Sequence, residues 1–181
     1  MNFLLLTLLL QQSLSDGRTP AQIRLVPVTE EEAVAEFEKI CFTGLQSLAA
    51  LQEALKASAW GYRSEAATLE GFRSNWSSVH GELNYIRRIP GQSALPLPQC
   101  NLTTLTRGAV DEQALRASVE AMLARQLGSA PTASSKGTSL SWTWAAPGGA
   151  PVSLYRLHAE PGGQQIDLSL QSGPGFGQEA K

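Results

Sequence analysis

Hydrophobic and polar residues alternate most regularly in the last third of the chain. Every second residue is apolar in 139–144 and again in 166–171, and the stretches "APGGAP" and "EPGGQQ" separate these segments from a third strand between them. Strict alternation gives a strand one dry face and one wet face. The pattern predicts an antiparallel meander, with the tryptophans read as core rather than as a ligand platform. Its buried residues are predicted to be Leu140, Trp142, Trp144, Val152, Leu154, Ile166, Leu168 and Leu170.

Three segments show helical periodicity instead. The first begins at Thr29, which forms a capping box with Glu32, and is predicted to end at Gly44. The second is expected from about residue 45 or 47 to 59, and the third over 111–127, with an aspartate as its N-cap and a glycine after its end. The stripes expected to face the core are Ala33, Val34, Phe37, Ile40 and Cys41 in the first, Leu48, Leu51, Leu55 and Ala59 in the second, and Leu115, Val119 and Met122 in the third.

The middle of the chain is less regular. The segments 82–89 and 99–106 are predicted to form a strand pair. In 64–80 a weak helical stripe is interrupted by glycine and serine, and 128–137 has the composition of a loop. No long internal repeat is visible in the sequence. Together these elements predict an α+β fold, in which an antiparallel sheet of about five strands has helices packed on one face.

The N-terminus resembles a secretory signal peptide. An apolar run from Phe3 to Leu10 is followed by polar residues, and small residues precede a cleavage point before Asp16. A buried N-terminal helix or strand is the alternative, because no basic residue precedes the run. The predicted organisation is a signal peptide (1–15), an extended lead-in (16–28), a single α+β domain (29–171) and a disordered tail (172–181). A periplasmic or extracellular location follows.

Composition excludes some classes of partner. The net charge is −2 with a pI near 5.7, and the densest basic spot is Arg87–Arg88, so nothing indicates nucleic-acid binding. No internal stretch has the ~18–20 apolar residues that a membrane span requires. Arg87 and Arg88 are interpreted as one ion-paired and one solvated residue, with an anion contact as the less favoured alternative.

The two cysteines, Cys41 and Cys100, allow several roles. In an oxidising compartment an even number of cysteines usually pairs, so a Cys41–Cys100 disulfide is predicted, closing a loop of 59 residues. Two separate buried thiols are the alternative if the N-terminal run is not a signal. A metal site lacks a CxxC motif, and a nucleophilic Cys41 would need a nearby histidine and a polar opening that an apolar helix face does not offer.

Catalytic and cofactor motifs are weak. His80 lies near Ser77 and Glu82, and His158 lies near Glu160, but no G-x-S-x-G elbow accompanies either histidine. We interpret both histidines as surface or strand-end residues. No phosphate loop, dinucleotide fingerprint, H-E-x-x-H motif or calcium loop is present, and we expect no cofactor and no metal. Asn75 and Asn101 each begin an N-x-S/T sequon, which matters only in a eukaryotic secretory pathway.

The order of short motifs resembles a known group of proteins. "FEKICFTG", "SAWGY", "CNLTTL" and "DEQALRASVEAMLARQL", followed by the tryptophan-bearing meander, span residues 34–171. This order resembles a diffuse group of small bacterial extracytoplasmic proteins with one disulfide and an F-x-x-x-C helix. The resemblance implies a secreted or periplasmic α+β domain with Cys41 and Cys100 paired, and it implies no activity.

Three functional hypotheses remain at this stage. The preferred one is a non-enzymatic accessory or interaction module outside the cytoplasm, with an unidentified protein partner. The second is a binder of small molecules or peptides in a groove between helices and sheet, with Arg87 or Arg88 as anion contact. The third is a hydrolase built around His80 or His158.

Overall fold

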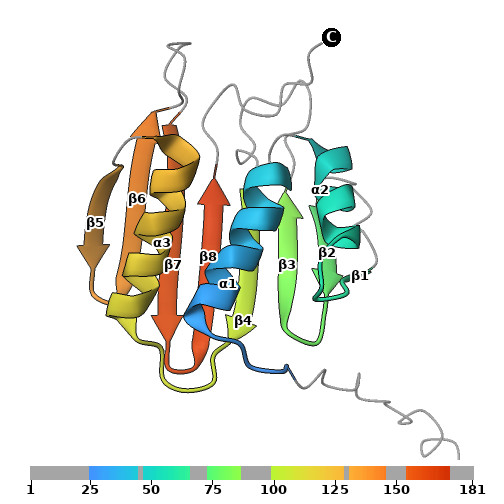
Figure 1. Ribbon diagram of the computed structural model, residues 1–181, viewed down its shortest axis with the longest axis horizontal. Helices are drawn as coiled ribbons and strands as arrows, with labels where there is room; N and C mark the ends of the chain where they lie inside the picture. The colour runs from blue at the N-terminus through green and yellow to red at the C-terminus, as the bar shows by residue number, and fades with distance from the viewer. Residues whose placement is uncertain are drawn as a thin grey trace, which may run out of the picture.

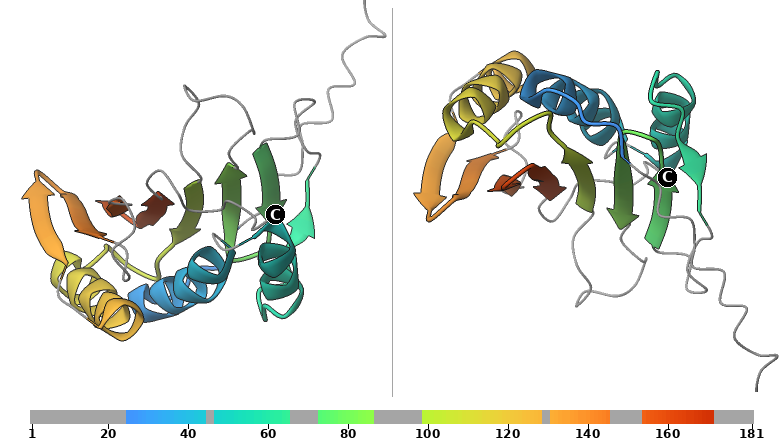
Figure 2. Two further views of the ribbon diagram at one scale, coloured as in Figure 1. Left: turned by 90° about the horizontal axis from the view of Figure 1, so that it is seen from above. Right: turned by 90° about the horizontal axis from the view of Figure 1, so that it is seen from below.

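An antiparallel sheet of eight strands forms the body of the protein, and three α-helices lie on one of its faces (Figures 1 and 2). The computed structural model describes residues 25–44, 47–65, 73–86, 99–128, 131–145 and 154–171. The predicted signal peptide and tail therefore lie outside the described residues. Within the described ranges, no helix has the length and hydrophobicity needed to cross a membrane.

The chain builds the sheet as two meanders that meet in the middle. The strand order is β1-β2-β3-β4-β8-β7-β6-β5, so β4 and β8 pair at the centre and β1 and β5 form the edges. Helical segments precede each meander, which is a repeat of architecture that the sequence did not reveal. In chain order the elements are α1 (Glu30–Phe37), the π-helix η1 (Glu38–Phe42), α2 (Leu48–Lys56), β1 (Arg63–Ser64), β2 (Arg73–Ser77), β3 (Gly81–Ile86), β4 (Gln99–Leu105), α3 (Glu112–Leu127), β5 (Thr132–Lys136), β6 (Ser139–Ala145), β7 (Leu154–Gly162) and β8 (Gln165–Gln171).

The predicted fold class is confirmed, but the predicted number of about five strands is wrong. The segment 64–80, in which the sequence shows a weak helical stripe, contains β2 and the end of β1. β5 lies in the segment 128–137, which is predicted to be a loop. These strands lacked a signal because they are at or near the edges of the sheet. All five residues of β5 are exposed, and Trp76 is the only large apolar residue of β2. An exposed edge strand needs no apolar alternation.

The first helix begins as predicted and then changes its winding. Thr29 Oγ1 accepts a hydrogen bond from the Glu32 N–H (3.2 Å), and the Glu32 carboxylate accepts one from the Thr29 N–H (2.8 Å), which confirms the capping box. From Glu38 the helix is a π-helix, whose wider turn contains Cys41. Gly44 is still helical, and a Cβ there would lie 2.5 Å from Leu51 Cδ1. This glycine therefore permits close packing against α2.

The other two helices follow their predicted caps. α3 starts after Asp111, whose carboxylate accepts the N–H groups of residues 113 and 114, and ends at Gly128 with a left-handed φ of 63°. α2 has Ser47 as N-cap and ends at Lys56, so it is shorter than predicted. Ala59 lies beyond its end and is exposed, which corrects its assignment to the inner stripe.

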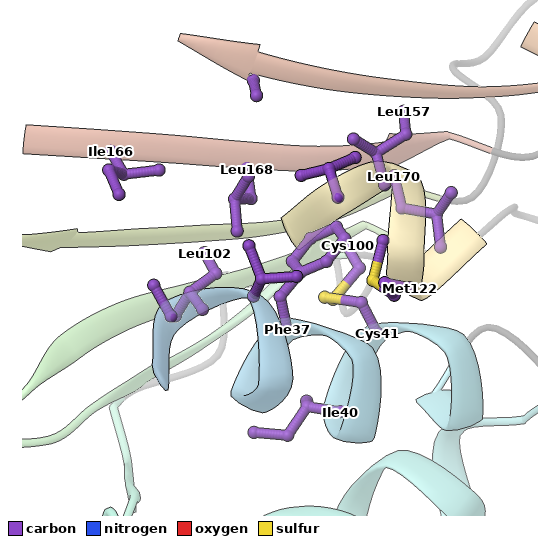
Figure 3. Packing of buried hydrophobic residues seen from close by; sticks show 14 of the residues in the cluster. Phe37, Ile40, Cys41, Cys100, Leu102, Met122, Leu157, Ile166, Leu168 and Leu170 are labelled. Atoms are coloured by element: carbon purple, nitrogen blue, oxygen red, sulfur yellow. A yellow bond between two sulfur atoms is a disulfide. The ribbon is translucent and has the colours of Figure 1, made fainter. Parts of the chain in front are cut away.

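The core lies between the helices and the sheet, and most of the predicted stripe residues are in it. Phe37 of α1 points to the sheet near Leu102 and Leu168, whereas Ile40 of η1 is buried on the side of the helical segment away from the sheet (Figure 3). Both meander tryptophans are buried, as predicted. Val152 lies outside the described residues. The core is therefore one continuous apolar layer, and the opposite face of the sheet carries mostly polar side chains, with Ile86 and Leu105 as apolar exceptions.

Candidate functional site

The face of the sheet away from the helices carries polar side chains in register across neighbouring strands. Burial alternates along β4 and β8, so the residues between the core positions point away from the helices. We call the side chains of β2, β3, β4 and β8 on that side the open face. Its described polar members are Arg73, Asn75, Ser77, Glu82, Asn84, Gln99, Asn101, Thr103, Gln165, Asp167, Ser169 and Gln171.

Side-chain amides form a continuous hydrogen-bonded chain across this face. Asn75, Asn84, Asn101 and Ser169 are successive cross-strand neighbours on four strands. Asn84 Nδ2 donates to Asn75 Oδ1, and Asn101 Nδ2 donates to Asn84 Oδ1 at 3.4 Å. Gln99 Nε2 donates both to Asn101 Oδ1 and to Ser169 Oγ, each at 2.8 Å. These five residues are called the amide chain below.

The amide chain still has capacity for further hydrogen bonds. An amide nitrogen carries two hydrogens, and the Nδ2 atoms of Asn84 and Asn101 each use one within the described part of the protein. Both side chains are partly exposed. Mutual bonding holds the amides in a fixed orientation, so an approaching group would meet prearranged donors and acceptors. Such a surface suits a neutral polar partner.

A second row of the open face is acidic. Glu82, Thr103 and Asp167 are cross-strand neighbours. Thr103 Oγ1 donates to Asp167 Oδ1 (2.6 Å), and Gln165 Nε2 donates to Asp167 Oδ2 (2.8 Å), so each oxygen of this carboxylate accepts one hydrogen bond from a neutral group. Among the described residues no group of three or more His, Cys, Asp or Glu side chains could hold a metal ion.

The disulfide anchors the strand that carries the amide chain. Cys41 of η1 and Cys100 of β4 are bonded, their Cα atoms are 5.5 Å apart, and both residues are completely buried (Figure 3). Cys100 lies between Gln99 and Asn101 and points to the opposite face. The predicted pairing is confirmed, and neither sulfur is a free thiol. The disulfide therefore holds β4 to η1 on the helical side of the sheet.

His80 does not assemble the catalytic group considered from the sequence. Its ring lies 5.3 Å from the ring of Trp60, and its Nδ1 lies 3.1 Å from the Val26 carbonyl oxygen. Within the described ranges no serine hydroxyl is within hydrogen-bond distance of this ring. Ser77 and Glu82 are opposite each other in the β2–β3 register. The three residues therefore do not form a nucleophile–base pair.

The remaining candidate residues are only partly placed. Arg87 and Arg88 follow β3 directly and lie outside the described residues. The backbone of His158 is in β7, with its Cα opposite those of Ser141 and Ser169. The anion contact and the second histidine hypothesis therefore stay predictions.

A separate polar cluster lies on the helical side of the sheet. The buried Glu36 carboxylate accepts a hydrogen bond from Ser58 Oγ, which in turn accepts the Trp60 N–H at 3.0 Å. The Tyr62 hydroxyl is buried without a partner among the described residues. Burial raises the pKa of Tyr62 well above its usual value, and the nearby Glu36 charge raises it further. Since Lys39 Nζ of η1 also donates to a backbone carbonyl just after α2 (2.7 Å), these contacts hold the α2–β1 connection against α1 and η1.

Sequence reasoning missed the amide chain as a unit. Asn75 and Asn101 were noted only as sequons, and Asn84 was not singled out. The alternation of Gln99 and Asn101 with buried residues was a usable signal within β4. The partner strand β2 was not recognised, so the row across the sheet could not be drawn.

Comparison with known proteins adds no relative. Neither the scan of protein-family models nor the searches of curated proteins and solved structures found a match. The function must therefore be argued from the open face itself.

Proposed function

We propose that this protein is a disulfide-stabilised interaction module that works outside the cytoplasm, catalyses no reaction itself and binds a partner protein through the open face. The observation that carries this proposal is the amide chain, which runs over four neighbouring strands on the face opposite the helices. In the described part of the protein the helices cover only one face of the sheet, which leaves the open face as a surface for a partner (Figure 2).

The chemistry of the open face favours a partner surface that is polar, neutral opposite the amide chain and neutral or basic opposite the acidic row of Glu82 and Asp167. The amide chain consists of neutral groups that both donate and accept hydrogen bonds. The carboxylate of Asp167 accepts hydrogen bonds only from neutral groups, so it keeps its negative charge and can still accept from a polar or basic group of the partner. Direct hydrogen bonds of this kind are typical of polar protein interfaces.

The location outside the cytoplasm is supported by two independent features. The apolar run at the N-terminus has the length of a signal-peptide core, and the only two cysteines are paired. Membership of the bacterial extracytoplasmic group described above is part of this proposal. The intact mass of protein isolated from its native host tests the location. Loss of residues 1–15 is the expected result, and full-length protein in the reducing cytoplasm would contradict the proposal.

In-cell photo-cross-linking tests the binding surface. A photoreactive phenylalanine is introduced at Asn84 or Asn101, with Ala121 on the exposed side of α3 as matched control. Defined adducts are expected from the two open-face positions and not from the control. Adducts of equal yield from Ala121, or no adduct from either asparagine position, would contradict the open face as the binding surface.

A further inference from the structure

We propose that the edge strand β5 pairs with the same strand of a second copy of this chain. β5 (Thr132–Lys136) is the last strand of the sheet, as Figure 1 shows, and all five of its residues are exposed. Within the described part of the protein, no strand pairs with its outer side. This edge is separate from the open-face residues of β2, β3, β4 and β8, so the proposal does not depend on the proposed function.

The two edges of the sheet differ in how well they are protected. Natural sheets protect an edge by making the strand very short or by placing charges, proline or bulges in it. β1 is two residues long and begins with Arg63. β5 has five residues with an uninterrupted register to β6, no proline and no acidic residue, and its single charge, Lys136, is at its end. β5 is therefore the edge with a free hydrogen-bonding row.

The turn between β5 and β6 determines which backbone groups of β5 face outward. Gly137, with φ of 62°, and the next residue form a two-residue turn between Lys136 and Ser139. Such a turn closes with a hydrogen bond between its flanking residues. In an antiparallel pair, bonded and non-bonded residues alternate. The N–H and C=O groups of Ala133 and Ser135 therefore point away from β6, toward the free edge.

These outward groups match a second β5 strand related by a two-fold axis at Ser134. In that register Ala133 exchanges two hydrogen bonds with Ser135 of the second copy. Ser134 lies opposite Ser134 of the second copy. Thr132 of each copy lies opposite Lys136 of the other, so the Lys136 side chains of the two copies are at opposite ends of the strand pair. All five residues are paired, whereas a shifted register leaves residues unpaired. A closed two-fold arrangement of this kind is the commonest symmetry of homo-oligomers.

Side chains on both faces of β5 are small enough to allow the approach. On the side of the open face, Ser134 Oγ lies 2.9 Å from Ser141 Oγ, and the pairing would extend this hydroxyl row into the second copy. On the helical side the strand presents only Ala133 and Ser135. Because a single strand pair buries a narrow strip, the dimer is expected to depend on protein concentration.

A cysteine at the two-fold axis tests the register. Ser134→Cys would place two thiols on facing, non-hydrogen-bonded residues about 4.5 Å apart at Cα, within the range of disulfides. Ser64→Cys on the opposite edge strand is the matched control, since both serines are exposed. Under mild oxidation Ser134→Cys should form a covalent dimer at least about tenfold faster than the control. Equal rates, or preferential linkage of Ser134→Cys to a different protein, would overturn the proposal.

Sedimentation of the purified protein over a concentration series tests the pairing without a cross-link. Ala133→Pro removes an N–H that points to the free edge and is not used in the β5–β6 ladder, so the variant should fold and lose the dimer. Ser134→Lys places like charges at the axis and should weaken the dimer at least about tenfold, while Ser64→Lys should not. A wild-type protein that stays monomeric at millimolar concentration, or a dimer unchanged by Ala133→Pro, would refute the inference.

Discussion

Removal of the disulfide by the double substitution Cys41→Ala/Cys100→Ala is the sharpest test of how this fold is held together. The bond joins η1 to β4 and closes a loop of 59 residues. In the chain-entropy account, a cross-link of that span destabilises the unfolded ensemble by roughly 4 kcal/mol. Single domains are stable by only about 5–15 kcal/mol. The double variant should therefore lose a large share of its stability.

Urea unfolding followed by tryptophan fluorescence measures this loss. Trp76, Trp142 and Trp144 are buried in the core, so unfolding should change their emission. We expect the midpoint to fall and the dependence on urea to steepen, because an unfolded chain without the cross-link exposes more surface. Two results would refute the reasoning. One is an unfolding free energy within about 1 kcal/mol of the wild type. The other is wild-type protein with two alkylatable thiols in denaturant without reductant.

Three further changes probe other parts of the fold. Gly81→Ala places a Cβ 2.6 Å from the Thr103 carbonyl oxygen and should cost about 1–3 kcal/mol in urea unfolding, whereas Gly108→Ala, with no atom within 4 Å of its Cβ, should change stability by less than about 0.5 kcal/mol. Asp111→Ala removes the cap of α3 and should lower the unfolding free energy by about 1 kcal/mol; no change would contradict the cap. The pKa of Tyr62 is raised in the folded protein, so its contribution is present below the unfolded pKa of about 10 and is lost as pH rises above it. Tyr62→Phe should reduce the alkaline loss of stability in unfolding titrations, and an unaltered pH profile would count against the buried hydroxyl.

The helices show how much local sequence can predict. The capping box at Thr29 and the cap of α3 at Asp111 were identified because a few adjacent residues satisfy the free N–H groups of a helix end. The shorter α2 was not anticipated, because a hydrophobic period can continue past the point where the backbone leaves the helix. The π-helix around Cys41 also left no pattern in the sequence, since both windings share one apolar stripe.

Whether a strand could be predicted from the sequence depended on its place in the sheet. Strands whose one side is buried, such as β4, β6 and β8, alternate visibly and were predicted. The edge strand β5 is exposed along its whole length, so no burial pattern marks it. The disulfide between Cys41 and Cys100 was predictable from the cysteine count and the expected compartment, although its partner elements depended on the fold.

The sequence alone determined the α+β class, the helix starts and the core positions of the central strands, because each depends on residues close together or on a period of burial. It also determined the cysteine pairing, because the chain has only two cysteines. Only the tertiary structure decided the strand order, which places β4 beside β8 and brings Asn75, Asn84, Asn101 and Ser169 into one row. The amide chain joins residues from four strands, and no local preference encodes their contact. Side chains that face solvent carry no burial pattern, so their grouping into a surface follows from strand pairing alone.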